Sequence, residues 1–268
     1  SPSSATVAAG QMQQFTAQGF DQNDQPMGNL TFTWASNDQS VATIDVNGLA
    51  TAVNTGATQI TASSGNVTSA PATLNVTAPP VPTAGQVIIN EALVSFATSS
   101  TQTRNDFLEL YNTTTQTLDI SGLVVSFRTS GTSNTPSTVT LPGATGSLTT
   151  LIKPHGYFLI VNGASTFGVA KDFDASGTGF NMNDTTGGIK IEIGGVKLDG
   201  LTYQGGSTAP NATFIAYGEG TLLTFTSGTT NDLIRSPNAT DTNNNTSDFK
   251  RNGATASVTP KAANPTLP

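Results

Sequence analysis

The sequence predicts an all-β protein made of two β-sandwich domains in tandem, joined by a proline-rich linker. Three observations lead to this prediction. Charged residues make up only 10% of the chain, against roughly 25% in typical soluble proteins, while Thr, Ser, Asn and Gly are abundant. Short alternating runs rich in β-branched and aromatic residues recur between turn residues. No stretch shows sustained helical periodicity.

The domain boundary is expected where prolines cluster. The stretch Thr77-Ala78-Pro79-Pro80-Val81-Pro82-Thr83-Ala84-Gly85 favours an extended, semi-rigid spacer. We therefore expect a first domain over residues 1–77, a linker over 78–85, a second domain over 86–252 and an extended C-terminal tail over 253–268. The chain of 268 residues is long enough for two domains that each bury a core.

The first domain is expected to contain closely spaced short strands. They are Gln13–Gly19, Leu30–Ala35, Val41–Ile44, Leu49–Val53, Ala57–Ala62 and Ala72–Val76. Alternation places Leu30, Phe32 and Trp34 on one face of their strand. Asp45-Val46-Asn47-Gly48 is typical of a hairpin turn, in which Gly supplies a positive φ. Strands this close together predict a small sandwich.

Several segments of this domain carry a family resemblance. They are Gly10-Gln11, Phe15-Thr16-Ala17, Phe32–Asn37, Ser40–Asp45, Asn47–Ala52 and Gly56–Ala62. In sequence and spacing they resemble the bacterial immunoglobulin-like group 2 domain. The resemblance implies an immunoglobulin-like sandwich that serves as a spacer in bacterial adhesins and surface proteins, without catalytic residues. One departure is that the extra strand which the family usually has before a segment like Ser1-Pro2-Ser3 is expected to be short or missing here, leaving an unpaired sheet edge beside an apolar groove.

The second domain has its own set of expected strands. They lie within Val87–Glu91, Asp106–Asn112, Leu118–Leu123, Pro154–Val161, Gly188–Ile193 and Val196–Tyr203, the last two flanking the turn Gly194-Gly195. These segments, with Asn183–Gly188 and Asp241–Phe249, resemble the lamin-tail domain. The resemblance implies a second immunoglobulin-like sandwich, from a family found in nuclear lamins and in secreted bacterial proteins as an accessory or anchoring piece.

Charge and composition exclude several kinds of partner. The net charge is −7 and the ten basic residues are spread thinly, so we expect no nucleic acid and no anionic membrane surface as a main partner. Without cysteine there is no disulfide or thiolate site, and no apolar stretch is long enough for membrane insertion. We expect a secreted, extracellular or cell-surface protein whose signal peptide was removed or left out of this sequence.

A calcium site is one hypothesis for the loop near residue 245. The spacing Asp241-x-Asn243-x-Asn245-x-x-Asp248 places oxygen-bearing side chains at alternate positions, as calcium loops do. The loop lacks glycine at its sixth position and has Asn252 instead of Glu at its twelfth. The alternative is an Asn/Asp-rich turn whose side chains bond to its own backbone.

A carboxylate pair is the other candidate for chemistry. Glu91 and Glu109 lie on strands that are expected to be neighbours, with Asp106 near them. Two such carboxyls can act as acid and base, as in glycosidases. Nothing else in the sequence completes a catalytic site, so we interpret them as structural residues that bond to backbone or to Arg104.

The remaining candidates are interpreted structurally. His155, the single histidine, lies in the turn Pro154-His155-Gly156, and without a second His or a Cys it predicts neither a transition-metal site nor a catalytic triad. Two groups of aromatic residues differ in their sequence context. The regular group, expected in the core and in cross-strand pairs, is Phe107, Tyr111, Tyr157 and Phe158; the irregular group, expected on an exposed contact surface, is Tyr203, Phe214, Tyr217 and Phe225.

These observations predict a non-enzymatic structural protein of a cell surface or extracellular fibre that associates with itself. The second hypothesis is an adhesive or accessory module that binds glycan or matrix. A free-standing hydrolase would need a nucleophile, a base and an oxyanion donor, and no such set can be named. We further hypothesise that the tail of one molecule adds a strand to the first domain of the next, which would produce filaments.

Overall fold

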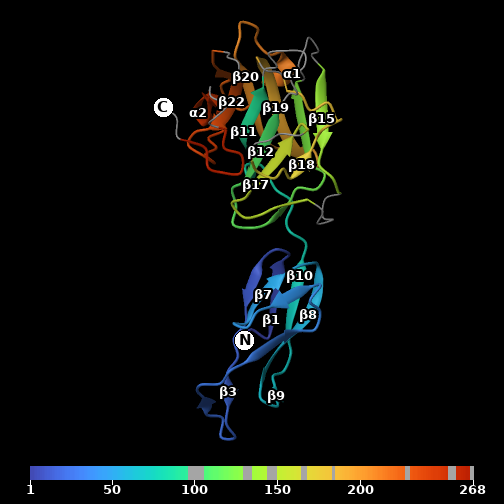
Figure 1. Ribbon diagram of the computed structural model, residues 1–268, viewed down its shortest axis with the longest axis vertical. Coiled ribbons are helices and arrows are strands. Elements are labelled where there is room, and N and C mark those ends of the chain that lie inside the picture. Colours follow the sequence, from blue (N-terminus) through green and yellow to red (C-terminus); the bar gives the residue numbers. More distant parts are fainter. Residues whose placement is uncertain are drawn as a thin grey trace. The chain divides into compact units, whose positions relative to one another are not determined.

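The all-β class is confirmed. A computed structural model describes residues 1–95, 106–128, 135–143, 150–163, 168–182, 185–226, 230–252 and 258–265. They divide into two compact units, residues 1–80 and 81–268 (Figure 1). Within the described residues the helices are two single turns, α1 (Ala212–Ile215) and α2 (Asn245–Asp248). Neither of them has the length or the apolar character needed to span a membrane.

The first unit is a small sandwich with one larger and one smaller sheet. Its strands are β1 (Ser4–Ala8), β2 (Met12–Gln14), β3 (Gly19–Phe20), β4 (Pro26–Met27), β5 (Thr33–Ser36), β6 (Ala42–Ile44), β7 (Leu49–Ala52), β8 (Gly56–Ser64), β9 (Val67–Thr68) and β10 (Ala72–Thr77). The larger sheet has the order β1-β10-β8-β5, with β9 paired to β8. The smaller sheet is β2-β7-β6, and β3 and β4 form a separate hairpin.

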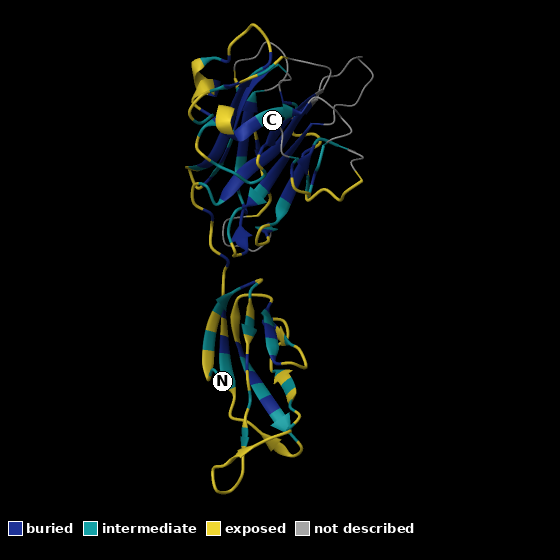
Figure 2. Cartoon of the chain, turned by 90° about the vertical axis from the view of Figure 1, so that its left-hand side faces the viewer, coloured by how far each residue is buried: buried dark blue, intermediate teal, exposed yellow. Residues whose placement is uncertain are grey.

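Period-two alternation builds the core of this unit. In β8, Thr58, Ile60 and Ala62 are buried while their neighbours are partly exposed, and Leu74 and Val76 of β10 follow the same rule. Figure 2 shows this mixture of buried and exposed positions along the strands. The predicted turn is confirmed, because Gly48 has φ +78° and joins the paired strands β6 and β7.

The strands expected from the sequence did not include the first strand of this unit. Ser4–Ala8 forms β1, which pairs in parallel with β10 from Ser4 opposite Thr73 to Ala8 opposite Thr77. The strand is built from small residues and carries no large apolar side chain, which is why its sequence gives a weak strand signal. One edge of β10 is therefore paired with a strand from the start of the chain.

The second unit is a larger two-sheet sandwich. Its strands are β11 (Val87–Ser95), β12 (Phe107–Asn112), β13 (Leu118–Asp119), β14 (Val124–Arg128), β15 (Pro136–Thr140), β16 (Leu151–Ile152), β17 (Tyr157–Val161), β18 (Phe173–Asp174), β19 (Thr186–Ile193), β20 (Val196–Gln204), β21 (Leu223–Thr224), β22 (Thr230–Arg235) and β23 (Phe249–Asn252). One sheet has six strands in the order β18-β17-β12-β11-β22-β23, and the other has five in the order β15-β14-β19-β20-β21. A small sheet, β13-β16, lies beside them.

The core of the second unit lies between the two larger sheets. Leu108 and Ile160 of the six-stranded sheet belong to one buried cluster with Val125, Ile191 and Leu201 of the five-stranded sheet. The predicted hairpin of β19 and β20 is confirmed, with positive φ at both glycines of its turn. Because one face of each sheet fills this core, the opposite face of the six-stranded sheet needs a separate cover.

Candidate functional site

Three residues of the predicted calcium loop, Asp241, Asn245 and Asp248, accept hydrogen bonds from backbone N–H groups within the fold. The Asn245 Oδ1 atom accepts hydrogen bonds from the backbone N–H groups of Thr202, at 2.8 Å, and Glu219, at 3.0 Å. Its Nδ2 atom donates to the carbonyl oxygen of Gly200 at 2.8 Å. Asn245 is fully buried and joins α2 to β20 and to residue 219. Its position follows from these backbone bonds without an ion.

The carboxylate of Asp248 also forms hydrogen bonds and an ion pair within the fold. Its carboxylate accepts hydrogen bonds from the backbone N–H of Thr242, at 3.0 Å, and from the Thr242 hydroxyl, at 2.5 Å. It also lies 3.2 Å from the guanidinium of Arg235. In the same turn the Asp241 Oδ1 atom accepts from the backbone N–H of Asn243. These bonds fit the alternative of a self-bonded Asn/Asp turn, and calcium binding by the four residues stays a prediction.

Arg235 is the centre of the charge network that holds this turn. Its side chain is fully buried and its Nη2 atom lies 2.6 Å from the Asp199 carboxylate. Nη1 reaches Asp248 and Asp241, and Nε donates to the backbone oxygen of Ile89 at 2.6 Å. One buried guanidinium therefore ties β22, β20, β11 and the turn together, a role that the sequence did not reveal.

Three acidic side chains meet beside this network. Asp199, Glu219 and Asp241 bring carboxylate oxygens within 4.8 Å of one another. Burial, followed by the charge of Asp199, raises the pKa of Glu219 to about 7. Cations already face the group, since Arg235 pairs with Asp199 and Lys197 lies 3.6 Å from Glu219. Part of the negative charge of this cluster is therefore offset by cations of the fold itself.

A second acidic group lies on the outer face of the six-stranded sheet. Glu91 of β11 stands directly opposite Glu109 of β12, as the sequence predicted for neighbouring strands. Asp232 of β22 stands opposite Leu93 and shares a side-chain hydrogen bond with Glu91. All three carboxyls have no exposed surface. We call Glu91, Glu109 and Asp232 the carboxyl cluster.

Burial dominates the protonation of the carboxyl cluster. Loss of solvation raises the pKa of Glu109 to about 8, and the charge of Glu91 adds to the shift. Burial also raises the pKa of Glu91 and that of Asp232, the latter with a further contribution from the charge of Glu91. A neutral Asp232 carboxyl can donate a hydrogen bond to the Glu91 carboxylate, which lets two acids share one buried place.

The C-terminal segment 258–265 covers the carboxyl cluster. The backbone N–H of Thr259 donates to Glu91 Oε1 at 3.1 Å, and the backbone N–H of Lys261 donates to Glu109 Oε2. Asn264 is 6% exposed and donates from Nδ2 to the backbone oxygen of Asn90 at 2.9 Å. The prediction of an extended tail is wrong for this segment, because Ala262 donates from its backbone N–H to the backbone oxygen of Thr259 at 2.9 Å in a turn that is seated on the second unit. Arg104, the alternative partner for the glutamates, lies outside the described residues.

Of the other sequence predictions for this unit, some are confirmed and one is wrong. His155 has φ 48° in an exposed turn, as expected, and its Nδ1 lies 3.4 Å from the Tyr111 hydroxyl. Tyr111 and Tyr157 form the expected cross-strand pair, with ring centroids 5.0 Å apart. The prediction of an exposed aromatic surface in the second unit is wrong. Tyr203, Phe214 and Tyr217 are buried and Phe225 is half-buried, because β20, α1 and the chain around β21 pack against the sheet.

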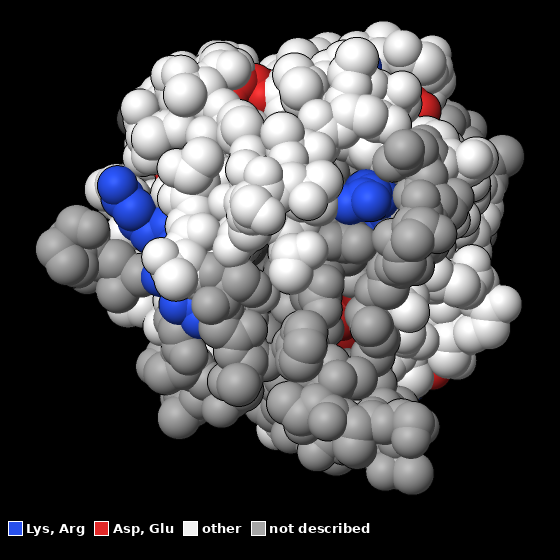
Figure 3. Space-filling model, turned by 90° about the horizontal axis from the view of Figure 1, so that it is seen from above, with Lys and Arg blue, Asp and Glu red and all other residues white. Residues whose placement is uncertain are grey.

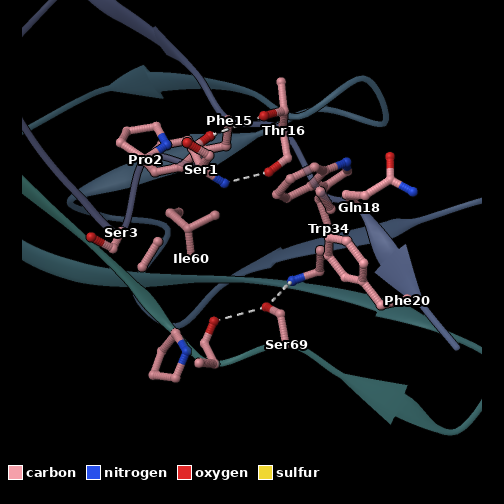
Figure 4. A pocket seen from close by; sticks show the side chains of 15 residues that line it. Ser1, Pro2, Ser3, Phe15, Thr16, Gln18, Phe20, Trp34, Ile60 and Ser69 are labelled. Atoms are coloured by element: carbon pink, nitrogen blue, oxygen red, sulfur yellow. Dashed lines mark hydrogen bonds between the residues drawn. The ribbon is translucent and has the colours of Figure 1, made fainter. Parts of the chain in front are cut away.

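Exposed aromatic surface lies in the first unit instead. A hollow of about 700 Å³ is lined by Phe15, Phe20, Trp34 and Ile60 together with hydroxyl and amide side chains (Figure 4). A second hollow of about 440 Å³ shares Phe20 with it and extends along the β3–β4 hairpin and β9. Phe20 is 59% exposed. The predicted Leu30-Phe32-Trp34 face supplies one wall of these hollows.

Comparison with protein families decides the nature of the first unit. Its sequence matches the model of the bacterial Ig-like domain (group 2). Residues 1–74 are similar to this family. The match confirms the resemblance seen in the sequence for the first unit, and the lamin-tail resemblance of the second unit stays a prediction.

Two solved structures are also similar. Domains 5–6 of the S-layer protein SbsC share 18% identity, with 74% of this chain and 91% of that chain covered and a TM-score of 0.26. Domains 4–9 of the same surface layer protein share 17% identity, covering 74% of this chain and 29% of that chain, with a TM-score of 0.27. A comparison with curated proteins gave no match.

Basic side chains in the described structure are largely paired with acids. Five of them lie within 4.0 Å of a carboxylate: Lys171, Lys190, Lys197, Arg235 and Lys261. On the face in Figure 3, Lys and Arg atoms form small separate patches among uncharged atoms. These cations stabilise local structure and do not gather into one basic stripe on that face.

Proposed function

We propose that the chain is a non-enzymatic structural module of a bacterial cell surface or extracellular assembly. The observation that carries the proposal is the cover over the carboxyl cluster. Glu91 and Glu109 are the residues best suited to acid–base chemistry, and both are sealed under the chain's own segment 258–265. The bacterial Ig-like match of the first unit supports a surface location for a secreted protein.

Self-association is part of this proposal. In the first unit β1 and β5 end the larger sheet, and a sheet edge is a natural place for a strand from another molecule. Filament formation by tail donation to the first unit would require segment 258–265 to leave the second unit, where it is bonded. An edge contact between first units needs no such release.

A solution experiment tests both parts. We expect sedimentation velocity to show association that grows with protein concentration, and no turnover of ester, phosphate or glycoside substrates. Hydrolysis that disappears in Glu109→Gln but persists in Glu192→Gln would refute the non-enzymatic assignment. A chain that stays monomeric at all concentrations would refute self-association.

Glycan or matrix binding is the second candidate, and the hollow of the first unit favours it. The exposed ring of Phe20 and the half-buried ring of Trp34, next to hydroxyl and amide groups, suit the stacking and hydrogen bonding of a neutral sugar. Trp34, the single tryptophan, provides a direct fluorescence signal for binding. We expect polysaccharide binding, if this candidate holds, to be lost in Phe20→Ser and kept in Val46→Ser, a matched change at a residue that is 84% exposed. Equal binding of polysaccharide by both variants would exclude the hollow as the glycan-binding site.

A further inference from the structure

The place occupied by segment 258–265 has the properties of a peptide-binding slot. Its floor is the outer face of the six-stranded sheet, where Leu93, Phe107, Leu159 and Val161 form an apolar cluster against which Val258 packs. Next to this apolar part lies the carboxyl cluster. We call this surface the slot.

Backbone groups of the segment are recognised by side chains of the slot. Two backbone N–H groups, those of Thr259 and Lys261, donate to the buried carboxyls of Glu91 and Glu109. The Thr259 hydroxyl also donates to Glu91, at 3.3 Å. Residues 259–262 form a turn, in which the backbone N–H of Ala262 donates to the backbone oxygen of Thr259 at 2.9 Å, and the bonds to the two carboxyls fix this turn in the slot.

The far end of the segment is fixed by an amide. Asn264 donates from its backbone N–H to Asn238 Oδ1 at 2.8 Å and from its Nδ2 to the backbone of Asn90 at 2.9 Å. The Lys261 ammonium lies 2.8 Å from the Asp172 carboxylate. The segment thus combines an apolar anchor, a cation and a buried amide along one short stretch.

Every one of these contacts is made to residues distant in sequence. The Thr259–Glu91 bond spans 168 positions, the Lys261–Glu109 bond 152 and the Asn264–Asn90 bond 174. None of them depends on the covalent connection through residues 253–257, whose sequence is Gly-Ala-Thr-Ala-Ser. The same bonds form when the segment comes from another molecule.

We propose that the slot binds segment 258–265 of a second copy of this chain, so that copies are joined by exchange of their C-terminal segments. This inference deepens the proposed self-association and rests on it, since it names a surface on the second unit through which copies are joined, separate from the sheet edges of the first unit. Residues 253–257 are the tether that joins the segment to its own second unit. Such a short tether gives the chain's own segment an effective concentration on the order of millimolar. Exchange is therefore favoured where copies are crowded, as on a surface.

The first test removes the tether and keeps every other part of the chain. Residues 253–257 are replaced by a specific protease site, and the folded chain is cut there. A fluorescein-labelled peptide of residues 254–268 is then added in excess, and its anisotropy is followed for one day. We expect saturable binding to the cut chain, competition by unlabelled peptide and binding to the uncut chain that is weaker by about a hundredfold or more.

Sequence-specific controls accompany this test. An Asn264→Ala peptide loses both bonds of the amide side chain and should bind at least about tenfold more weakly. An Ala262→Ser peptide changes an exposed position and should bind as the unchanged peptide does. A cut chain that stays folded but takes up no labelled peptide overturns the proposal, as does equal binding of all three peptides.

A second measurement separates this inference from the proposed function. The full, uncut chain and a variant that ends at Asn252 are compared by sedimentation velocity, with the exposed Asn23→Ala variant as the matched control and circular dichroism to show that each protein is folded. Association lost only in the truncated chain supports exchange through the slot. Association that is equal in all three proteins overturns exchange while leaving the structural function intact, and absence of association in all three overturns both.

Discussion

Substituting Glu109 by Gln should change how the stability of the second unit depends on pH. Glu109 is fully buried, and its pKa is raised to about 8 from 4.5 by burial. A carboxyl whose pKa is higher in the folded state contributes its full stability below pH 4.5 and loses it as the pH rises toward 8. Gln has no such titration, so this part of the pH dependence should vanish.

The size of the effect follows from the pKa shift. One unit of pKa shift corresponds to about 1.4 kcal/mol, so between pH 5.0 and 7.5 ionisation of Glu109 should lower the free energy of unfolding by about 3 kcal/mol. The amide of Gln leaves either the Asn90 amide or the Lys261 N–H without an acceptor, which costs about 1–2 kcal/mol at every pH. Relative to the unchanged protein, Glu109→Gln should thus gain about 3 kcal/mol over this pH range.

The two units can be followed separately in one urea titration. All four tyrosines lie in the second unit and the single tryptophan lies in the first, so near-ultraviolet circular dichroism of Tyr reports one and Trp34 fluorescence the other. Glu192→Gln is the matched control, because this side chain is 25% exposed and paired with Lys190. It should alter stability by less than about 1 kcal/mol. Equal pH dependence in Glu109→Gln and the unchanged protein would refute the reasoning.

Three further changes have defined outcomes. Replacing the buried Arg235 by Met leaves several acids without their counter-charge and should cost about 3–5 kcal/mol or prevent folding of the second unit, measured by thermal melting. In Gly200→Ala the new Cβ would lie 1.8 Å from the backbone oxygen of Tyr217, so we expect a loss of about 1–3 kcal/mol, whereas Gly28→Ala, with nothing within 4 Å, should be neutral. Millimolar calcium should leave the melting temperature unchanged if the self-bonded turn is correct, because the oxygens of this turn already accept hydrogen bonds. A calcium-dependent rise that is abolished in Asp241→Asn would support the calcium hypothesis instead.

Local patterns predicted the parts of the fold that depend on local sequence. The strand expected over Ala57–Ala62 is β8, and the glycine pair at 194–195 correctly placed the hairpin of β19 and β20. Such features follow from side-chain alternation and from glycine's access to positive φ. Strand β1 was missed because its pairing with β10 comes from distant sequence and its own residues are small.

The site was predictable only in part for a similar reason. Neighbouring strands and alternation were enough to bring Glu91 and Glu109 together. Nothing near either residue indicated Asp232, whose strand follows long after them, or the segment that covers all three. The irregular sequence around Tyr203 and Phe214 led to the prediction that they are exposed, but both are buried. Contacts between distant segments decide these points, and single-sequence patterns do not contain them.

The parallel pairing of β1 with β10 has a mechanical consequence. These strands begin and end the first unit, and their five residue pairs run from Ser4–Thr73 to Ala8–Thr77. A force applied between Ser1 and the linker after Thr77 pulls the two strands in opposite directions along their length. The load then falls on all the hydrogen bonds between them at once, as shear, instead of opening them one after another. The rate of forced unfolding of this unit is therefore set by the rupture of one whole ladder.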